Sequence, residues 1–365
     1  MSGSGADLTI FWLVVAGRLL LPLLIFRCPL PGILACLVLD GIDQTVFQLF
    51  TGLDLTDYQS FDKALDIYYL SLAYLAIMRN WTNRAAAEIA RFLYFYRMIG
   101  TVIFELSGGV HRWLLLVFPN TFEYYFICYE VVRLRWNPAS RSRRFWILAA
   151  AAIWVVIKIP QELWIHVLQL DFTDTWRDVS WFAPTVLIGL IVLLAVFWFV
   201  LRPRLDPADH GWQVMAGPLP EGVDEVREQV RGGRVLTSWL AEKIAIVALL
   251  SVVLANIVPS VTASPLQITV SVTALIIVNS FVGLLFARLG VGGHPLVIGF
   301  VVQYLINLGL VLLANTVLPT RPAYFLAAGS FFLLLLTLVV VLYDRFRPVI
   351  AVRSVTPLAA APVAG

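Results

Sequence analysis

Long apolar runs separated by short polar segments recur along the whole chain. A helix needs about 20 mostly apolar residues to cross the hydrocarbon core of a membrane. Backbone N–H and C=O groups within lipid must be hydrogen-bonded inside the segment, so these runs are predicted to be helices. The pattern predicts an all-α, polytopic transmembrane helix bundle of about 11 spans. The expected spans are 8–26, 30–50, 62–78, 85–106, 113–132, 145–169, 179–201, 236–257, 268–287, 295–315 and 323–343.

The composition excludes most other classes of protein. Hydrophobic residues make up 60% of the 365 residues and charged residues 13%, about half the charged fraction of an average soluble domain. An ordinary soluble enzyme, a disordered chain and a disulfide scaffold are thereby excluded. Arginine outnumbers lysine in a chain rich in Ala, Val and Leu, which favours a bacterial protein. We therefore expect a multi-pass protein of the bacterial inner (plasma) membrane.

Basic residues are concentrated in alternate connections between the expected spans. The odd-numbered connections and the C-terminal tail hold most of them, including Arg79, Arg84 and the stretches 133–144 and 202–234. Cytoplasmic loops carry an excess of Lys and Arg, so the N-terminus is predicted outside and the C-terminus inside. Arg133–Arg144 would then contact anionic lipids of the inner leaflet. No basic domain lies outside the expected spans, so nucleic acid is not an expected partner.

Charge also divides the chain into regions. Residues 1–201 form an expected charge-rich bundle of about seven spans, and 202–235 form a cytoplasmic connection. Residues 236–343 form an apolar bundle of about four spans. Residues 344–365, rich in Ala and Pro, are expected to be a disordered cytoplasmic tail.

Ionisable and amide side chains lie within spans two to six at helical spacing. Each central charge costs roughly 2.5–3.5 kcal/mol when it is left in lipid, so we expect these side chains to converge on one polar cavity that opens to the outside. The set comprises Asp40, Asp43 and Gln44 on one face of the second span, Asp62 and Asp66 in the third, Arg97 and Glu105 in the fourth, Glu123 in the fifth, and Lys158, Glu162 and His166 in the sixth.

These residue types indicate chemical roles within the cavity. Carboxylates at one depth can hold a hard cation, and Asp43, Asp62 and Asp66 are the expected ligands of a divalent ion such as Mg²⁺. Asp43, Glu162 and His166 are the expected catalytic acid and base groups. Arginine and lysine suit an anionic head group. The expected substrate contacts are Arg97, Lys158, Asp40, Gln44, Glu105 and Glu123.

The aspartate spacing bears a partial resemblance to a known family. Asp40-x-x-Asp43 followed by Asp62-x-x-x-Asp66 loosely resembles the metal-binding signature of the CDP-alcohol phosphotransferases, in which aspartates on two consecutive membrane helices bind divalent cations. That signature has Gly directly after its second aspartate and then Ala-Arg, whereas Gln44 follows Asp43 here and no Ala-Arg pair appears. Membership of the family is therefore not predicted.

Three functions remain open from the sequence. The first is an enzyme that acts at the outer leaflet on a lipid-linked or phosphate-bearing substrate. The second is an ion-coupled solute transporter, because intramembrane acids and bases often form ion or proton paths. The third is a structural or assembly subunit, in which Arg97 with Glu105, or Lys158 with Glu162, forms ion pairs that only lock the bundle.

Overall fold

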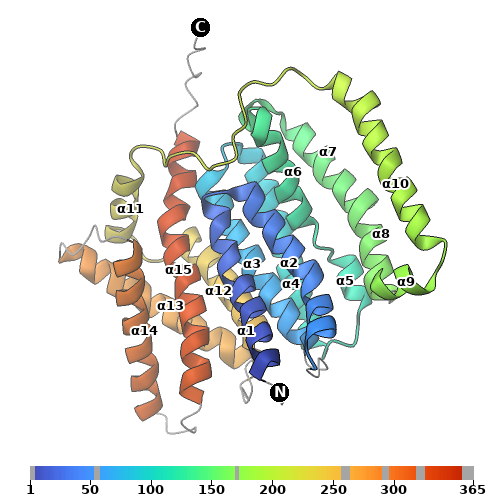
Figure 1. Cartoon of the computed structure of the whole chain (residues 1–365). Helices are drawn as coiled ribbons and strands as arrows, with labels where there is room; N and C mark the ends of the chain where they lie inside the picture. Colours follow the sequence, from blue (N-terminus) through green and yellow to red (C-terminus); the bar gives the residue numbers. More distant parts are fainter. Residues whose placement is uncertain are drawn as a thin grey trace.

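Helices are the only regular secondary structure in the part of the chain that the structure describes. A computed structural model describes residues 5–52, 58–168, 172–255, 264–289, 296–317 and 325–355, and this part contains helices and no strands. In Figure 1 the first described helix begins at the lower end of the bundle, and the last one reaches the upper end. The all-α prediction is confirmed for these residues.

The helices follow one another with short connections through most of the chain. The first half contains α1 (Gly5–Leu20), the 3₁₀ helix η1 (Leu21–Phe26), α2 (Pro29–Phe50), α3 (Tyr58–Asn80), α4 (Arg84–Leu106), α5 (Trp113–Val117) and α6 (Thr121–Arg135). The outer helices are α7 (Arg143–Ala152), α8 (Ile159–Glu162), α9 (Phe172–Asp178) and α10 (Phe182–Val196). The second half contains α11 (Val223–Gly232), α12 (Ser238–Ala255), α13 (Pro265–Arg288), α14 (Leu296–Val317) and α15 (Phe325–Val355).

Several helical segments have the length and hydropathy of membrane spans. Within the described residues, 6 segments qualify, which indicates a multi-pass membrane protein. The expected count of about 11 spans is not confirmed. α3 and α4 are as long as the qualifying segments but are not among them. α3 carries the charged residues Asp62, Lys63 and Asp66 in its first half. The qualifying segments are Gly5–Phe26, Pro29–Phe50, Arg143–Ile165, Phe182–Arg204, Ser238–Ala255 and Pro265–Arg288.

Two expected segments differ from the structure. The span expected at 113–132 is two helices, because α5 ends at Val117 and α6 begins at Thr121. Pro119 lacks an N–H group and disfavours helical backbone in the residue before it, so the helix is interrupted there. The expected tail is also partly helical, since α15 continues to Val355 with Phe346 and Val349 buried. Residues 356–365 of that tail lie outside the described residues.

α3 is the central helix of the bundle. Almost every side chain from Ala64 to Met78 is buried, and α3 packs against α1, α2, α4, α12 and α15. A helix that is apolar around its whole circumference belongs in the interior. Tyr74 stacks on Tyr94 of α4, with ring centroids 4.5 Å apart. This packing fixes the position of Asp62 and Asp66 at the beginning of α3.

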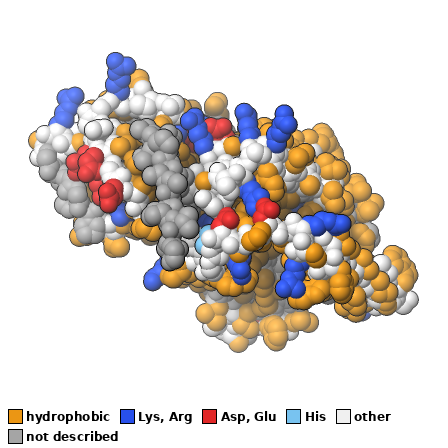
Figure 2. Space-filling model, turned by 90° about the horizontal axis from the view of Figure 1, so that it is seen from above, with side chains coloured by type: hydrophobic (Ala, Val, Ile, Leu, Met, Phe, Trp, Pro, Cys, Tyr) orange, Lys and Arg blue, Asp and Glu red, His pale blue; other side chains and the backbone are white. Residues whose placement is uncertain are grey.

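The outer helix α10 is apolar, whereas basic side chains gather at the upper end of the bundle. The most apolar part of the α10 span contains no buried residue among those that the structure describes; the helix stands apart from the central helices (Figure 1). Figure 2 views the upper end and shows Lys and Arg side chains around it. The connections α3–α4, α6–α7 and α10–α11 lie at this end in Figure 1. Their basic residues therefore gather on one face, as the alternation in the sequence predicts, while the orientation in a membrane stays a prediction.

Candidate polar site around Arg18

Arg18 of α1 lies at the centre of four aspartates. Its Nη1 donates hydrogen bonds to Asp43 and Asp62, and its Nη2 donates to Asp40 and Asp66. A guanidinium group presents five N–H donors in a planar fork, so one arginine can serve several carboxylates at once. We call these five residues the Arg18 cluster.

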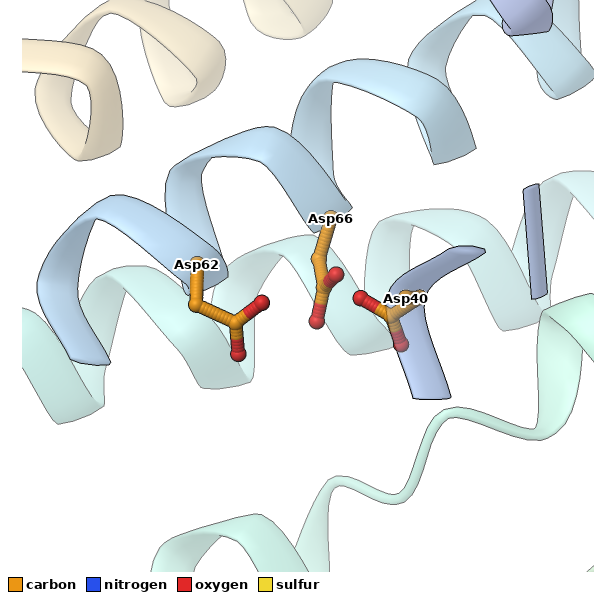
Figure 3. Close-up of side chains that lie close together, drawn as sticks. All are labelled: Asp40, Asp62 and Asp66. Atoms are coloured by element: carbon orange, nitrogen blue, oxygen red, sulfur yellow. The ribbon is translucent and has the colours of Figure 1, made fainter. Parts of the chain in front are cut away.

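The aspartates of the Arg18 cluster come from two helices that face each other. Asp62 and Asp66 lie one turn apart on α3 and point toward Asp40 of α2 (Figure 3). Carboxylate oxygens of these three residues all lie within 4.8 Å of one another. Their side chains are 35%, 21% and 27% exposed, respectively, whereas that of Asp43 is 2% exposed. The cluster thus has a buried side at Asp43 and an accessible edge formed by the other three.

The charges within the Arg18 cluster do not balance. Four carboxylates share one guanidinium. Like charges held close together in a partly buried site repel one another strongly, because the local dielectric constant is far below that of water. Either protons or a bound cation would reduce this repulsion. The accessible edge is the side from which a cation can reach the oxygens.

A second group of polar residues begins one turn along α3. Tyr69 donates a hydrogen bond to Glu123 of α6. Glu123 also accepts a hydrogen bond from Asn120 Nδ2, at 2.9 Å, and the Asn120 main-chain N–H donates to Glu162 Oε1, at 3.2 Å. Lys158 Nζ lies 3.4 Å from the same Glu162 oxygen. A row of polar contacts therefore runs from α3 through α6 to α8, all of it buried.

The turns around α8 depart from regular α-helical geometry. Ile153–Lys158 and Leu163–Val167 are π-helical, and Pro160 lies between them. Proline cannot donate the usual main-chain hydrogen bond, and π-helical turns are one way in which a long helix absorbs such a defect. The four-residue spacing of Lys158, Glu162 and His166 in the sequence suggests one helical face. Because the segment is not a regular α-helix, this spacing describes only the pair of Lys158 and Glu162.

Arg97 of α4 reaches the interruption between α5 and α6. Its Nη1 donates to the main-chain oxygen of Phe118, at 3.0 Å. Its Nε is buried and has no hydrogen-bond partner among the described residues. Arg97 thus holds α4 to the helix interruption, and its pairing with Glu105 stays a prediction.

The predicted site residues are distributed as follows. The Arg18 cluster holds Asp40, Asp43, Asp62 and Asp66, and the row from α3 to α8 holds Glu123, Lys158 and Glu162. The three carboxylates that face one another include Asp40 in place of the expected Asp43, because Asp43 lies on the buried side of Arg18.

Two other predicted residues lie outside both groups, and the side chain of a third is not described. Gln44 is exposed, and its main-chain N–H donates to Asp43 Oδ1. Glu105 lies near the end of α4, where Lys63 is its electrostatic neighbour. The side chain of His166 lies outside the described part of the structure.

The basic stretch expected at the inner leaflet is only partly available to lipid. Arg133 is buried, where it donates to Glu130 and to the main-chain oxygen of Met215. Arg141 pairs with Asp206, while Arg143 and Arg144 are exposed. Contact with anionic lipids is therefore a proposal for Arg143 and Arg144 alone.

Comparison with known proteins gives no further assignment. No family model, no curated protein and no solved structure matches the chain. The fold and the composition indicate a multi-pass membrane protein with several apolar helices. Any finer function has to be inferred from the geometry of the site.

Proposed function

We propose that the protein is a membrane enzyme that binds a divalent cation, such as Mg²⁺, and acts on a lipid-linked or phosphate-bearing substrate. The observation that carries this proposal is the Arg18 cluster, in which three accessible carboxylates lie together around a single guanidinium. Hard cations prefer carboxylate oxygens. Arg18 holds the carboxylates in place, and the cation takes up the remaining negative charge at the accessible edge.

The proposed roles follow from burial and neighbours. Asp40, Asp62 and Asp66 are the cation ligands, and Asp43 positions Arg18 from the buried side. A bound cation can polarise a phosphoryl oxygen of the substrate. Glu162 is the acid or base group, since its carboxylate is within reach of both Lys158 and the beginning of α6. We propose the outer leaflet as the site of action, in keeping with the predicted orientation.

An ion-coupled carrier is the second candidate. The observation that favours it is the row of polar contacts through Tyr69, Glu123, Asn120 and Glu162, which connects three helices. Chains of acids and hydroxyl groups inside a membrane often carry protons. Under this alternative the Arg18 cluster binds the coupling ion.

Cation binding tests the common part of both candidates. The purified full chain in phosphatidylcholine nanodiscs is titrated with Mg²⁺, Mn²⁺ and Ca²⁺ by calorimetry. We expect saturable binding that Asp62→Asn weakens at least about tenfold, the effect of about 1.4 kcal/mol of lost interaction. Glu88→Gln is the matched control, because Glu88 is an exposed partner of Arg84. If none of the three ions binds to the wild type, the proposal is wrong.

A second measurement separates the enzyme from the carrier. The protein is incubated with Mg²⁺ and a bacterial polar-lipid extract, and consumed lipids are identified by mass spectrometry. An enzyme is expected to consume a lipid in the wild type and not in Asp62→Asn. Sodium or proton flux into proteoliposomes, without consumption of any lipid, would instead support the carrier.

A further inference from the structure

The interruption between α5 and α6 places the beginning of a helix inside the bundle. α6 has 15 residues, and Asn120 is its N-cap residue, yet the Asn120 side chain makes no capping hydrogen bond. Its Nδ2 instead donates to Glu123. The first N–H groups of a helix have no partner within the helix, and the helix dipole adds partial positive charge there. Helix beginnings of this kind are favourable places for anions.

Three buried polar atoms near this helix beginning have no partner in the described residues. They are Arg97 Nε, Asn120 Oδ1 and Thr121 Oγ1, in residues that are 8%, 8% and 1% exposed. Roughly 90% or more of buried polar groups in proteins are hydrogen-bonded. Arg97 is held at the same place by its bond to Phe118. Arg97 Nε and Thr121 Oγ1 can donate hydrogen bonds, whereas Asn120 Oδ1 can only accept one. The two unpartnered donors favour the binding of a polar group from outside the chain.

The cationic groups at the helix beginning can bind a negatively charged group if it replaces a carboxylate that lies there. Arg97 and Lys158 are both buried close to it. One carboxylate already lies there, because Glu162 accepts from the Asn120 main-chain N–H and lies beside Lys158. The Glu123 carboxylate, by contrast, is engaged by Tyr69 and by the Asn120 side chain. The same donors that hold Glu162 can therefore hold an oxyanion that replaces it.

We propose that the beginning of α6, together with Arg97, Thr121 and Lys158, forms a subsite for a phosphate group. This inference deepens the proposed function, on which it rests for the assumption that the phosphate belongs to the substrate. Discontinuous membrane helices present their half-helix beginnings to anionic substrate groups in the same manner. Arg97 supplies charged donors, Thr121 supplies a hydroxyl group that has no other partner among the described residues, and Glu162 occupies the subsite in the absence of phosphate.

Phosphate binding without any metal tests this subsite. The full chain in phosphatidylcholine nanodiscs, in the presence of EDTA, is titrated with inorganic phosphate. A parallel sample contains phosphatidic acid, so that a lipid head group is distinguished from the free ion. We expect saturable binding in at least one sample, weakened at least about tenfold by Arg97→Gln and by Thr121→Val. Glu162→Gln should tighten binding, because it removes the competing negative charge.

Thr101→Val is the matched control for Thr121→Val. Thr101 is equally buried, and its hydroxyl group already donates to the main-chain oxygen of Arg97. We expect this control to bind phosphate as the wild type does. The inference is overturned if neither form of phosphate binds to the wild type or to Glu162→Gln, or if Arg97→Gln and Thr121→Val bind like the wild type. Asp62→Asn should retain phosphate binding under EDTA, so failure of the cation site is distinguishable from failure of this subsite.

Discussion

Arg18 is the residue on which the aspartate cluster depends. Replacing it by glutamine leaves four carboxylates without a cationic partner, and breaking a buried ion pair in this way costs about 3–5 kcal/mol. We expect Arg18→Gln to lower the melting temperature in detergent strongly at pH 8. The difference from the wild type should shrink at pH 5, because protonation removes the repulsion between the carboxylates.

The exposed pair of Arg84 and Glu88 provides the control for this prediction. Exposed pairs contribute about 0–1 kcal/mol, so Arg84→Gln should change the melting temperature little at either pH. A deficit in Arg18→Gln that is the same at pH 8 and pH 5 would show that Arg18 stabilises the protein by packing rather than by neutralising the aspartates.

The residues of the Arg18 cluster could be predicted from the sequence in part. Helical spacing placed Asp62 and Asp66 on one face of a helix, and the cost of burying charge required them to meet other polar groups. Arg18 was missed, although it is the sole ionisable residue in the apolar run 8–26. A lone charge in such a run must have a partner, and the aspartates of the second and third expected spans were available as partners. That signal was present in the sequence and would have identified the centre of the cluster.

At the scale of elements, Gly100 allows α4 to approach the interruption between α5 and α6. A Cβ atom at this position would lie 2.1 Å from Cβ of Phe118, which cannot move without its backbone. We expect Gly100→Ala to destabilise the protein by about 1–3 kcal/mol through overpacking and to displace Phe118 from Arg97. The measurement is thermal unfolding, with phosphate binding as a second readout.

Gly41 in α2 is the matched control for Gly100. Nothing lies within 4 Å of a Cβ atom built on it, so Gly41→Ala should stabilise the helix by about 0.5–1 kcal/mol. The same substitution is thus expected to have opposite signs at the two positions. Equal effects would mean that α4 does not pack closely against the interruption.

The elements whose bounds hydropathy predicted well are the uninterrupted helices. α2 and α12 begin and end close to the expected bounds, because hydropathy alone determines them. The interrupted elements were less predictable. Pro119 divides one expected span, whereas Pro160 lies within a continuous helical segment. The sequence around a proline does not show whether neighbouring helices will supply partners for the freed backbone groups, so tertiary packing decides between the two outcomes.

At the scale of the whole molecule, the positions of the basic residues predict a sidedness that can be measured. The connection at Ser140 should face the cytoplasm, and residue Asp57 should face the outside. Alkaline phosphatase fused after Asp57 is expected to be active in a bacterial host and inactive when fused after Ser140, and green fluorescent protein should give the opposite result. Reversed signals would invert the orientation and move the proposed site of action to the inner leaflet.

Glu242 of α12 joins the second half of the chain to the first. Its carboxylate accepts hydrogen bonds from Tyr74 of α3, at 2.6 Å, and from Tyr343 and Arg347 of α15, at 3.0 and 2.8 Å. Arg91 of α4 lies 3.2 Å away. All of these contacts meet at one buried side chain. The two halves are therefore expected to unfold together rather than as separate bundles.

A double-mutant cycle between Tyr74→Phe and Glu242→Leu measures this connection. Each single variant should be destabilised, since Glu242→Leu leaves buried tyrosine hydroxyl groups without their acceptor and Tyr74→Phe removes one donor from a buried carboxylate. Because the two residues are in direct contact, the double variant should lose less stability than the sum of the two, with a coupling of about 0.5–3 kcal/mol. Tyr343→Phe with Tyr74→Phe tests whether the coupling spreads through the shared carboxylate to α15. Additive effects in both cycles, together with two separate unfolding transitions, would show that the halves are independent bundles.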